Sequence, residues 1–205
     1  MEPALQSSLF DPADRRELGN GAWLEVRPGW LTQGDSGSVD SLFGELRDAV
    51  RWRAERRQMY DRVLDVPRLV GFHDFADPTD AAPHPALARI RARLNDTYAA
   101  ELGEPFATVG LCLYRDGRDS VAWHGDTMGR SNDEDTIIAI LGLGATRVFA
   151  MRPRGGGRSL RLRHSHGDLL VMGGSCQRTW EHCIPKTTRP SGPRISVQYR
   201  AFDVR

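Results

Sequence analysis

The sequence predicts a mostly β protein with flanking helices, built around a double-stranded β-helix (jelly-roll) core. From about residue 105 onward, short apolar segments alternate with Gly, Asp and Pro signals that are typical of turns. Before that point the chain has a turn-rich, charged start and two segments with helical periodicity. About eight strands suit two packed sheets, whose barrel mouth commonly holds a small-molecule site.

Residues 1–104 are predicted to form an N-terminal extension to this core, within one folded unit. Its first helix begins after Ser38 or Asp40, and its second follows Pro85, a residue that is favourable at the start of a helix. Each helix carries an apolar stripe that we expect to face the core. The stripes are Leu42, Phe43, Leu46 and Val50 in the first helix and Leu87, Ile90, Leu94 and Tyr98 in the second.

Residues 105–205 are predicted to form the jelly-roll core. Some of its strands alternate polar and apolar residues, as residues 159–163 do, whereas residues 136–141 are apolar on both faces. The glycine-rich residues 153–157 predict a hairpin loop. The strands are expected near 107–115, 120–126, 136–142, 146–152, 158–163, 168–173, 179–184 and 194–202.

Bulk composition excludes several classes of protein. A net charge of +1 over 205 residues gives no global signal for binding polyanions, so any contact with nucleic acid must come from a local patch. The three cysteines lack C-x-x-C spacing, which favours a reducing compartment. No apolar run reaches the length of a membrane span and no signal-peptide pattern opens the chain. We therefore expect a cytoplasmic, soluble monomer.

A metal site is predicted around His124 and Asp126. Alternate side chains of a strand share a face, so these two can bind one ion together. A second histidine from another strand would complete a two-histidine, one-carboxylate set, which is typical of non-haem Fe(II) oxygenases. The sequence offers His164, His166 and His182 for that position.

The three candidate histidines differ in their surroundings. His166 precedes a Gly-Asp turn, and a turn histidine that bonds its own loop is the favoured interpretation there. His182 lies in a short strand that Pro185 ends, which suits a ligand at a barrel mouth. A zinc site built from Cys176, His182 and Cys183 is a weaker alternative, because these residues lack the paired spacing of structural zinc sites.

The segment Arg194–Arg200 predicts a strand with one apolar and one polar face. The polar face carries Arg194, Ser196, Gln198 and Arg200. Because an arginine fork binds carboxylates bidentately, two arginines on one face suit a dicarboxylate such as 2-oxoglutarate. A solvent-facing edge strand is the alternative interpretation.

Taken together, these segments resemble the AlkB family of Fe(II)/2-oxoglutarate dioxygenases, which repair alkylated nucleic acid. The resemblance covers residues 105–205 and, more loosely, residues 52–72. It is carried by residues 111–114 (LCLY), 119–126 (DSVAWHGD) and 166–174 (HGDLLVMGG), together with His182, Arg194 and Arg200.

The resemblance implies iron ligands at His124, Asp126 and His182. It implies that Arg194, supported by Tyr114, binds the distal carboxylate of 2-oxoglutarate, and that Arg200 lies beside its chelating end. The implied cofactors are Fe(II), 2-oxoglutarate and O₂. The implied reaction is oxidative demethylation of 1-methyladenine or 3-methylcytosine in DNA or RNA, with release of succinate, CO₂ and formaldehyde.

On the substrate side, the resemblance places a nucleotide-recognition lid at about residues 51–72. The basic and aromatic residues 51–60 suit stacking and phosphate contacts, and Trp52 and Tyr60 are candidate substrate-binding residues. Two positions depart from the family pattern. Cys112 stands where an asparagine is usual, and Met128 stands where many members place a second acid near the target base, so it too is a substrate-binding candidate.

Two other functions fit parts of the pattern. One is a 2-oxoglutarate-dependent hydroxylase of a small molecule or protein, which Met128 and the near-neutral charge favour. The other is a jelly-roll binding module without catalysis.

Overall fold

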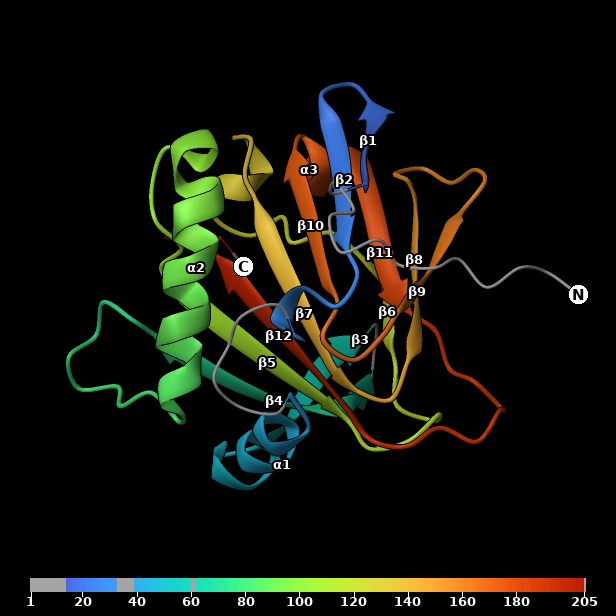
Figure 1. Cartoon of the computed structure of the whole chain (residues 1–205). Coiled ribbons are helices and arrows are strands. Elements are labelled where there is room, and N and C mark those ends of the chain that lie inside the picture. The colour runs from blue at the N-terminus through green and yellow to red at the C-terminus, as the bar shows by residue number, and fades with distance from the viewer. Residues whose placement is uncertain (1–13, 33–38, 60–61, 205) are drawn as a thin grey trace, which may run out of the picture.

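The computed structural model describes residues 14–32, 39–59 and 62–204, and its antiparallel strands confirm the predicted jelly roll (Figure 1). The larger sheet has eight strands in the order β1-β2-β10-β7-β12-β5-β4-β3, and the smaller has four in the order β6-β11-β8-β9. The larger sheet contains β1 (Asp14–Gly19), β2 (Ala22–Arg27), β3 (Arg53–Met59), β4 (Arg62–Asp74), β5 (Thr108–Tyr114), β7 (Ile138–Gly144), β10 (Leu169–Gly174) and β12 (Arg194–Arg200). The smaller contains β6 (Val121–His124), β8 (Arg147–Pro153), β9 (Leu160–His164) and β11 (Trp180–Ile184).

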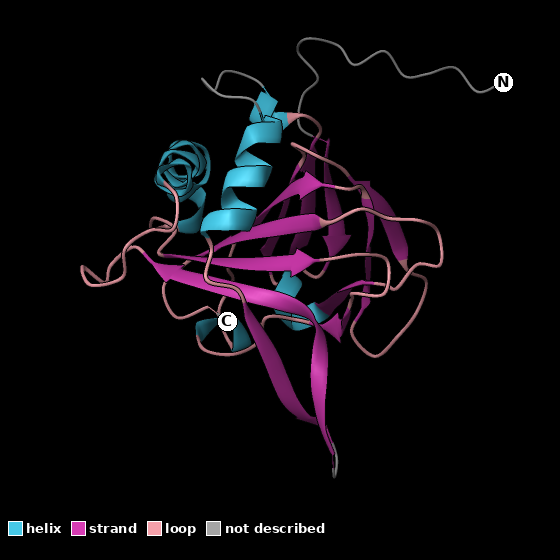
Figure 2. Ribbon diagram, turned by 90° about the horizontal axis from the view of Figure 1, so that it is seen from below, coloured by secondary structure: helices cyan, strands magenta, loops and turns pink. Residues whose placement is uncertain are grey.

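The eight strands predicted after residue 105 are all present as β5 to β12, and each predicted bound lies within two residues of the observed one. Two hairpins were not predicted. The β1–β2 hairpin extends one edge of the larger sheet, and the β3–β4 hairpin extends the other edge and projects from the body (Figure 2). The glycine-containing turn between β1 and β2 has positive φ angles at Gly19, Asn20 and Gly21.

Both predicted helices are confirmed as α1 (Val39–Ala49) and α2 (Pro85–Leu102). The second begins with Pro85, and its preceding residue, His84, accepts a hydrogen bond from the Ala86 N–H. It ends at Gly103, whose φ of 82° lets its N–H reach the Ala99 carbonyl. The remaining helical turns are η1 (Trp30–Thr32), η2 (Arg130–Asn132) and α3 (Cys176–Thr179).

The larger sheet separates two apolar clusters, because alternate side chains of its strands point to opposite faces. On the outer face, α1 and α2 pack against residues that include Leu111, Leu141 and Val197 (Figure 2). On the inner face, Cys112 and Tyr114 meet residues of the smaller sheet such as Met151. The inner space between the two sheets is therefore where polar residues of β12 come to lie.

Substitution of Gly173 in β10 tests how closely this strand packs against Trp23 of β2. A Cβ added there would lie 2.0 Å from the Trp23 ring, opposite it on β2. We expect Gly173→Ala to lower the free energy of unfolding by about 1–3 kcal/mol, measured by chemical denaturation. Gly44→Ala is the matched control, because Gly44 lies inside α1 with nothing within 4 Å and should gain about 0.5–1 kcal/mol. Changes of the same sign in both variants would contradict this packing.

Candidate metal centre

Three side chains converge at the mouth of the barrel. Strands β6 and β11 pair so that His182 lies directly opposite His124, with ring centroids 4.2 Å apart. The Asp126 carboxylate joins them, and the ligand atoms of the three residues all lie within 4.8 Å of one another. Within the described part of the chain, this is the one group of three or more histidine, cysteine or acidic residues with metal-binding proximity.

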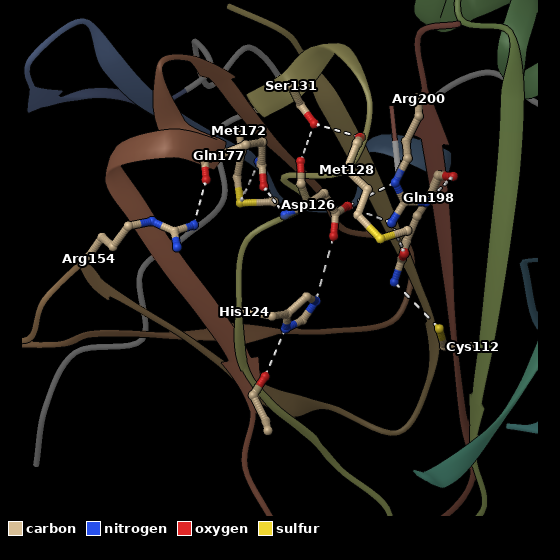
Figure 3. Close-up of polar contacts among 11 residues, drawn as sticks. Cys112, His124, Asp126, Met128, Ser131, Arg154, Met172, Gln177, Gln198 and Arg200 are labelled. Atoms are coloured by element: carbon tan, nitrogen blue, oxygen red, sulfur yellow. Dashed lines mark hydrogen bonds and ion pairs between the residues drawn. The ribbon is translucent and has the colours of Figure 1, made fainter. Parts of the chain in front are cut away.

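Asp126 reaches the cluster from a loop, which differs from the predicted strand over 120–126. The strand ends at His124, two residues before Asp126. The Asp126 N–H donates to the Gln177 side-chain oxygen over 3.0 Å, and the Ser131 hydroxyl donates to the Asp126 carbonyl (Figure 3). Gly125 is required here, because a Cβ would lie 2.6 Å from the Gln177 carbonyl oxygen.

The protonation of His124 suits a metal ligand. Its Nδ1 lies 2.8 Å from the Ala122 carbonyl oxygen, which can only accept, so Nδ1 carries the hydrogen and Nε2 has its lone pair free. Nε2 faces Oδ1 of Asp126 at 3.7 Å. Burial lowers the pKa of His124, and it lowers the pKa of His182 to about 3, so both imidazoles are neutral at neutral pH.

Arg200 keeps the Asp126 carboxylate ionised. Its Nε and Nη2 atoms lie 2.8 and 2.7 Å from Oδ2 of Asp126 (Figure 3). Burial alone would raise the pKa of this carboxyl, but Arg200 and the two histidines hold the pKa well below its usual range. Oδ2 of Asp126 thus pairs with Arg200, while Oδ1 faces His124. This arrangement orients Asp126 by one oxygen and leaves the other available for a metal ion.

Arg194 is buried completely at the opposite end of β12, paired in register with Tyr114 of β5. Its Nη1 donates to the carbonyls of His164 and Ala145, and its Nη2 bonds the His164 ring. No carboxylate among the described residues forms an ion pair with it, and its Nε is buried without a hydrogen-bond partner. Burial lowers the pKa of Arg194 to about 10, so the guanidinium is charged at neutral pH. A buried charge in this state fits an anionic ligand.

Between the two arginines lies Gln198, which the sequence placed on the same polar face. Its side-chain oxygen accepts from Nη2 of Arg200 over 2.6 Å, and its amide donates to the Cys112 sulfur over 3.7 Å (Figure 3). Burial raises the pKa of the Cys112 thiol, which stays neutral. Because β12 is paired on both edges and its polar face points inward, the edge-strand alternative does not apply.

The candidate substrate-binding residues are not all near the metal centre. Met128 is 63% exposed and lies beside Arg200 and Asp126 (Figure 3). Trp52 instead packs against the outer cluster under the helices, where its indole N–H donates to the Arg47 carbonyl. Tyr60 lies outside the described residues.

The two other candidate histidines have structural partners. His166 accepts a hydrogen bond from the Gly144 N–H over 2.7 Å, as expected for a turn histidine. Both ring nitrogens of His164 have hydrogen-bond partners, namely Arg194 and the Asp168 carbonyl.

Sequence reasoning missed two residues of this site. Arg68 of β4 is buried, and its positive charge acts on Tyr114 and on both histidines of the cluster. It lies in an otherwise apolar segment, so no pattern singled it out. Gln177, which holds the Asp126 backbone, belongs to a four-residue helix that was not predicted.

The chain is similar in sequence to known proteins. The pattern of the 2OG-Fe(II) oxygenase superfamily matches residues 26–200. The chain is 31% identical over 189 residues to the bovine "Alpha-ketoglutarate-dependent dioxygenase alkB homolog 3", covering 84% of this chain and 64% of that protein. It is 31% identical over 179 residues to the mouse "DNA oxidative demethylase ALKBH2", covering 79% of this chain and 74% of that protein.

The fold is also similar to a solved structure, OsALKBH1. The TM-score is 0.61 at 12% sequence identity, covering 90% of this chain and 100% of that one, so this likeness concerns the fold alone. The chain spans 64% of the length of the bovine and the human alkB homolog 3 proteins, and it is 30% identical to the human one.

Substitution of two different histidines should affect metal binding differently. His182→Ala should weaken Co(II) or anaerobic Fe(II) binding by more than the roughly 10–100-fold that loss of an outer partner causes. His166→Ala is the control and should bind metal as the wild type does, because its ring contacts the Gly144 N–H and the Asp40 carboxylate and is not part of the metal cluster. Titration of the metal-free proteins measures both affinities. Equal weakening in the two variants would contradict the assignment.

Proposed function

The chain belongs to the AlkB family of the 2OG-Fe(II) oxygenase superfamily, and on that basis we propose that it oxidatively removes alkyl groups from bases of DNA or RNA. The proposed lesions are of the 1-methyladenine and 3-methylcytosine type. The observation that carries the proposal is the cluster of His124, Asp126 and His182 within the same barrel as the buried, carboxylate-free Arg194.

Fe(II) is the metal that this donor set fits. Two neutral imidazoles and one carboxylate leave open coordination positions, as non-haem Fe(II) oxygenases require. His124, Asp126 and His182 would hold the ion. With 2-oxoglutarate and O₂, the bound iron would supply the oxidation that hydroxylates an N-methyl carbon, so that the methyl group is lost as formaldehyde and 2-oxoglutarate is converted to succinate and CO₂.

The protein's own residues bind and orient the reactants. Arg194 would bind the distal carboxylate of 2-oxoglutarate, because it offers unused N–H donors inside the barrel. Tyr114 packs in the next strand at the same level. Arg200 keeps the carboxylate of Asp126 ionised and turns one oxygen of it toward His124.

A basic groove supports a nucleic-acid substrate. It has a volume of about 560 Å³ and lies between β8, β9 and the segment after β11. Four of its cationic side chains are exposed, and the described residues that line it include no acid. Such a surface suits phosphates, whose neutralisation supplies most of the sequence-independent affinity for nucleic acid. The groove's cationic side chains are Arg147, Arg161, Arg163, Lys186 and Arg189.

The proposal also includes a cytoplasmic monomer. All three metal ligands and both arginines come from one chain, so no second copy is needed to complete the centre. Cys112, Cys176 and Cys183 are buried and free, which suits a reducing compartment. No helix in the described ranges is long and apolar enough to cross a membrane.

A second candidate is a 2-oxoglutarate-dependent hydroxylase of a small molecule or protein. Met128 favours it, because an exposed thioether beside the metal centre offers no charge or directional acceptor for a base.

Modified oligonucleotides distinguish the two candidates. With iron, O₂ and 2-oxoglutarate, we expect the full chain to release formaldehyde and unmodified base from oligonucleotides that contain 1-methyladenine or 3-methylcytosine. His124→Ala should abolish both products. Succinate formation without either product would rule out the nucleic-acid substrate and favour the second candidate.

Arg194→Ala separates co-substrate binding from metal binding. Loss of one partner of a buried charged pair costs about 3–5 kcal/mol, so the 2-oxoglutarate requirement should rise at least about a hundredfold while metal affinity is retained. Arg118→Ala is the matched control, since that side chain is 89% exposed. Binding to the metal-loaded protein, measured calorimetrically, gives both values. Wild-type affinity in Arg194→Ala would show that another residue binds the carboxylate.

A further inference from the structure

We propose that His164 is a positioning residue for Arg194. Its unprotonated Nδ1 accepts a hydrogen bond from the guanidinium and so determines which edge of Arg194 faces the co-substrate. The identity of that co-substrate, 2-oxoglutarate, rests on the proposed function. The positioning itself rests on contacts within the protein.

Two hydrogen bonds define the tautomer of His164, which ends β9 and is 1% exposed. Its Nε2 lies 3.0 Å from the Asp168 carbonyl oxygen, which can only accept, so Nε2 carries the hydrogen. Its Nδ1 lies 2.8 Å from Nη2 of Arg194, which can only donate, so Nδ1 has a free lone pair. The first contact requires a hydrogen on Nε2 and the second requires an unprotonated Nδ1, so together they specify the neutral Nε2–H tautomer.

The neutral form persists over the working range of pH. Burial, and secondarily the charge of Arg194, lower the pKa of His164 to about 3. A protonated ring would direct an N–H at the guanidinium, and the contact would be lost.

The hydrogen bonds of Arg194 leave one edge of its fork unused. A guanidinium has five N–H donors. Nη1 donates to the carbonyls of His164 at 2.8 Å and Ala145 at 3.4 Å, and Nη2 donates once to His164 Nδ1. The Nε–H and the second Nη2–H remain. These two atoms form a single edge of the fork, which matches a carboxylate bidentately.

The turn that presents the Asp168 carbonyl is itself fixed. One oxygen of the Asp168 side chain accepts from the Ser165 N–H over 2.8 Å, and the other accepts from the Gly29 N–H over 2.9 Å. Gly142 leaves room for the guanidinium, because a Cβ there would lie 3.0 and 3.2 Å from Nη2 and Nη1 of Arg194. His164 is therefore held in place before any ligand binds.

Substitutions at His164 can keep or remove the acceptor. Asparagine places its amide oxygen near the position of Nδ1, whereas leucine offers no acceptor. In the Mn(II)-loaded full chain, we expect His164→Leu to bind 2-oxoglutarate roughly 10- to 100-fold more weakly, from the loss of one hydrogen bond to a charged group. His164→Asn should recover most of that affinity. Metal affinity should be unchanged in both variants, since the ring does not contact the metal ligands directly.

Calorimetry of these proteins separates two kinds of failure. If the wild type binds 2-oxoglutarate and His164→Leu binds it equally well, His164 does not position Arg194. If the wild type itself does not bind 2-oxoglutarate, the proposed function and the ligand in this inference are both wrong. If His164 has only a structural role, both substitutions should lower the stability of the protein, and His164→Asn should not recover affinity for 2-oxoglutarate. That result would also overturn the proposal.

The ¹⁵N resonances of the histidines in the wild type give a second test that needs neither ligand nor variant. We expect His164 to show a protonated Nε2 and an unprotonated Nδ1 throughout the neutral range. A protonated Nδ1 would overturn the proposal even if His164→Leu failed to fold.

Discussion

Strand β12 is hydrogen-bonded along its length on both edges, to β5 and to β7, and the whole site depends on that pairing. The register places Arg194 and Arg200 at the two ends of one inward-facing row, with Ile195, Val197 and Tyr199 packed outward against the helices. Because side chains alternate along a strand, a slip of one residue would move both guanidiniums into the apolar outer layer. Burial of the apolar residues on the outer face of β12 therefore fixes the strand register, and with it the positions of the polar side chains on the inner face.

The two arginines of that row have different electrostatic surroundings. Arg200 is compensated within the protein, since it forms a close ion pair with Asp126. Arg194 is more deeply buried and bonds only carbonyl oxygens and a neutral imidazole. Carbonyls and a neutral ring stabilise a cation less than a carboxylate does. The barrel thus contains one internal ion pair, between Arg200 and Asp126, and one buried guanidinium, that of Arg194, which can bind an anionic ligand.

Much of the fold and of the metal centre could be predicted from the sequence. The strands after residue 105 were found because their apolar patterning reflects burial on the inner and outer faces. His182 was one of three candidate histidines, and only the resemblance to the AlkB family singled it out as the third ligand. The β3–β4 hairpin was missed because residues 53–59 are mostly polar and lack that apolar patterning. Arg68 and the orientation of His164 could not be predicted, because each depends on contacts between segments distant in the chain.

The most direct test of this site is a crystal structure of the full chain with Mn(II) and 2-oxoglutarate under anaerobic conditions. We expect the metal on His124, Asp126 and His182, with the distal carboxylate of 2-oxoglutarate against Nε and Nη2 of Arg194. The contact between His164 and Arg194 and the ion pair between Arg200 and Asp126 should both be retained. A distal carboxylate bound to another cation, with Arg194 still facing only His164 and the carbonyls, would contradict this assignment.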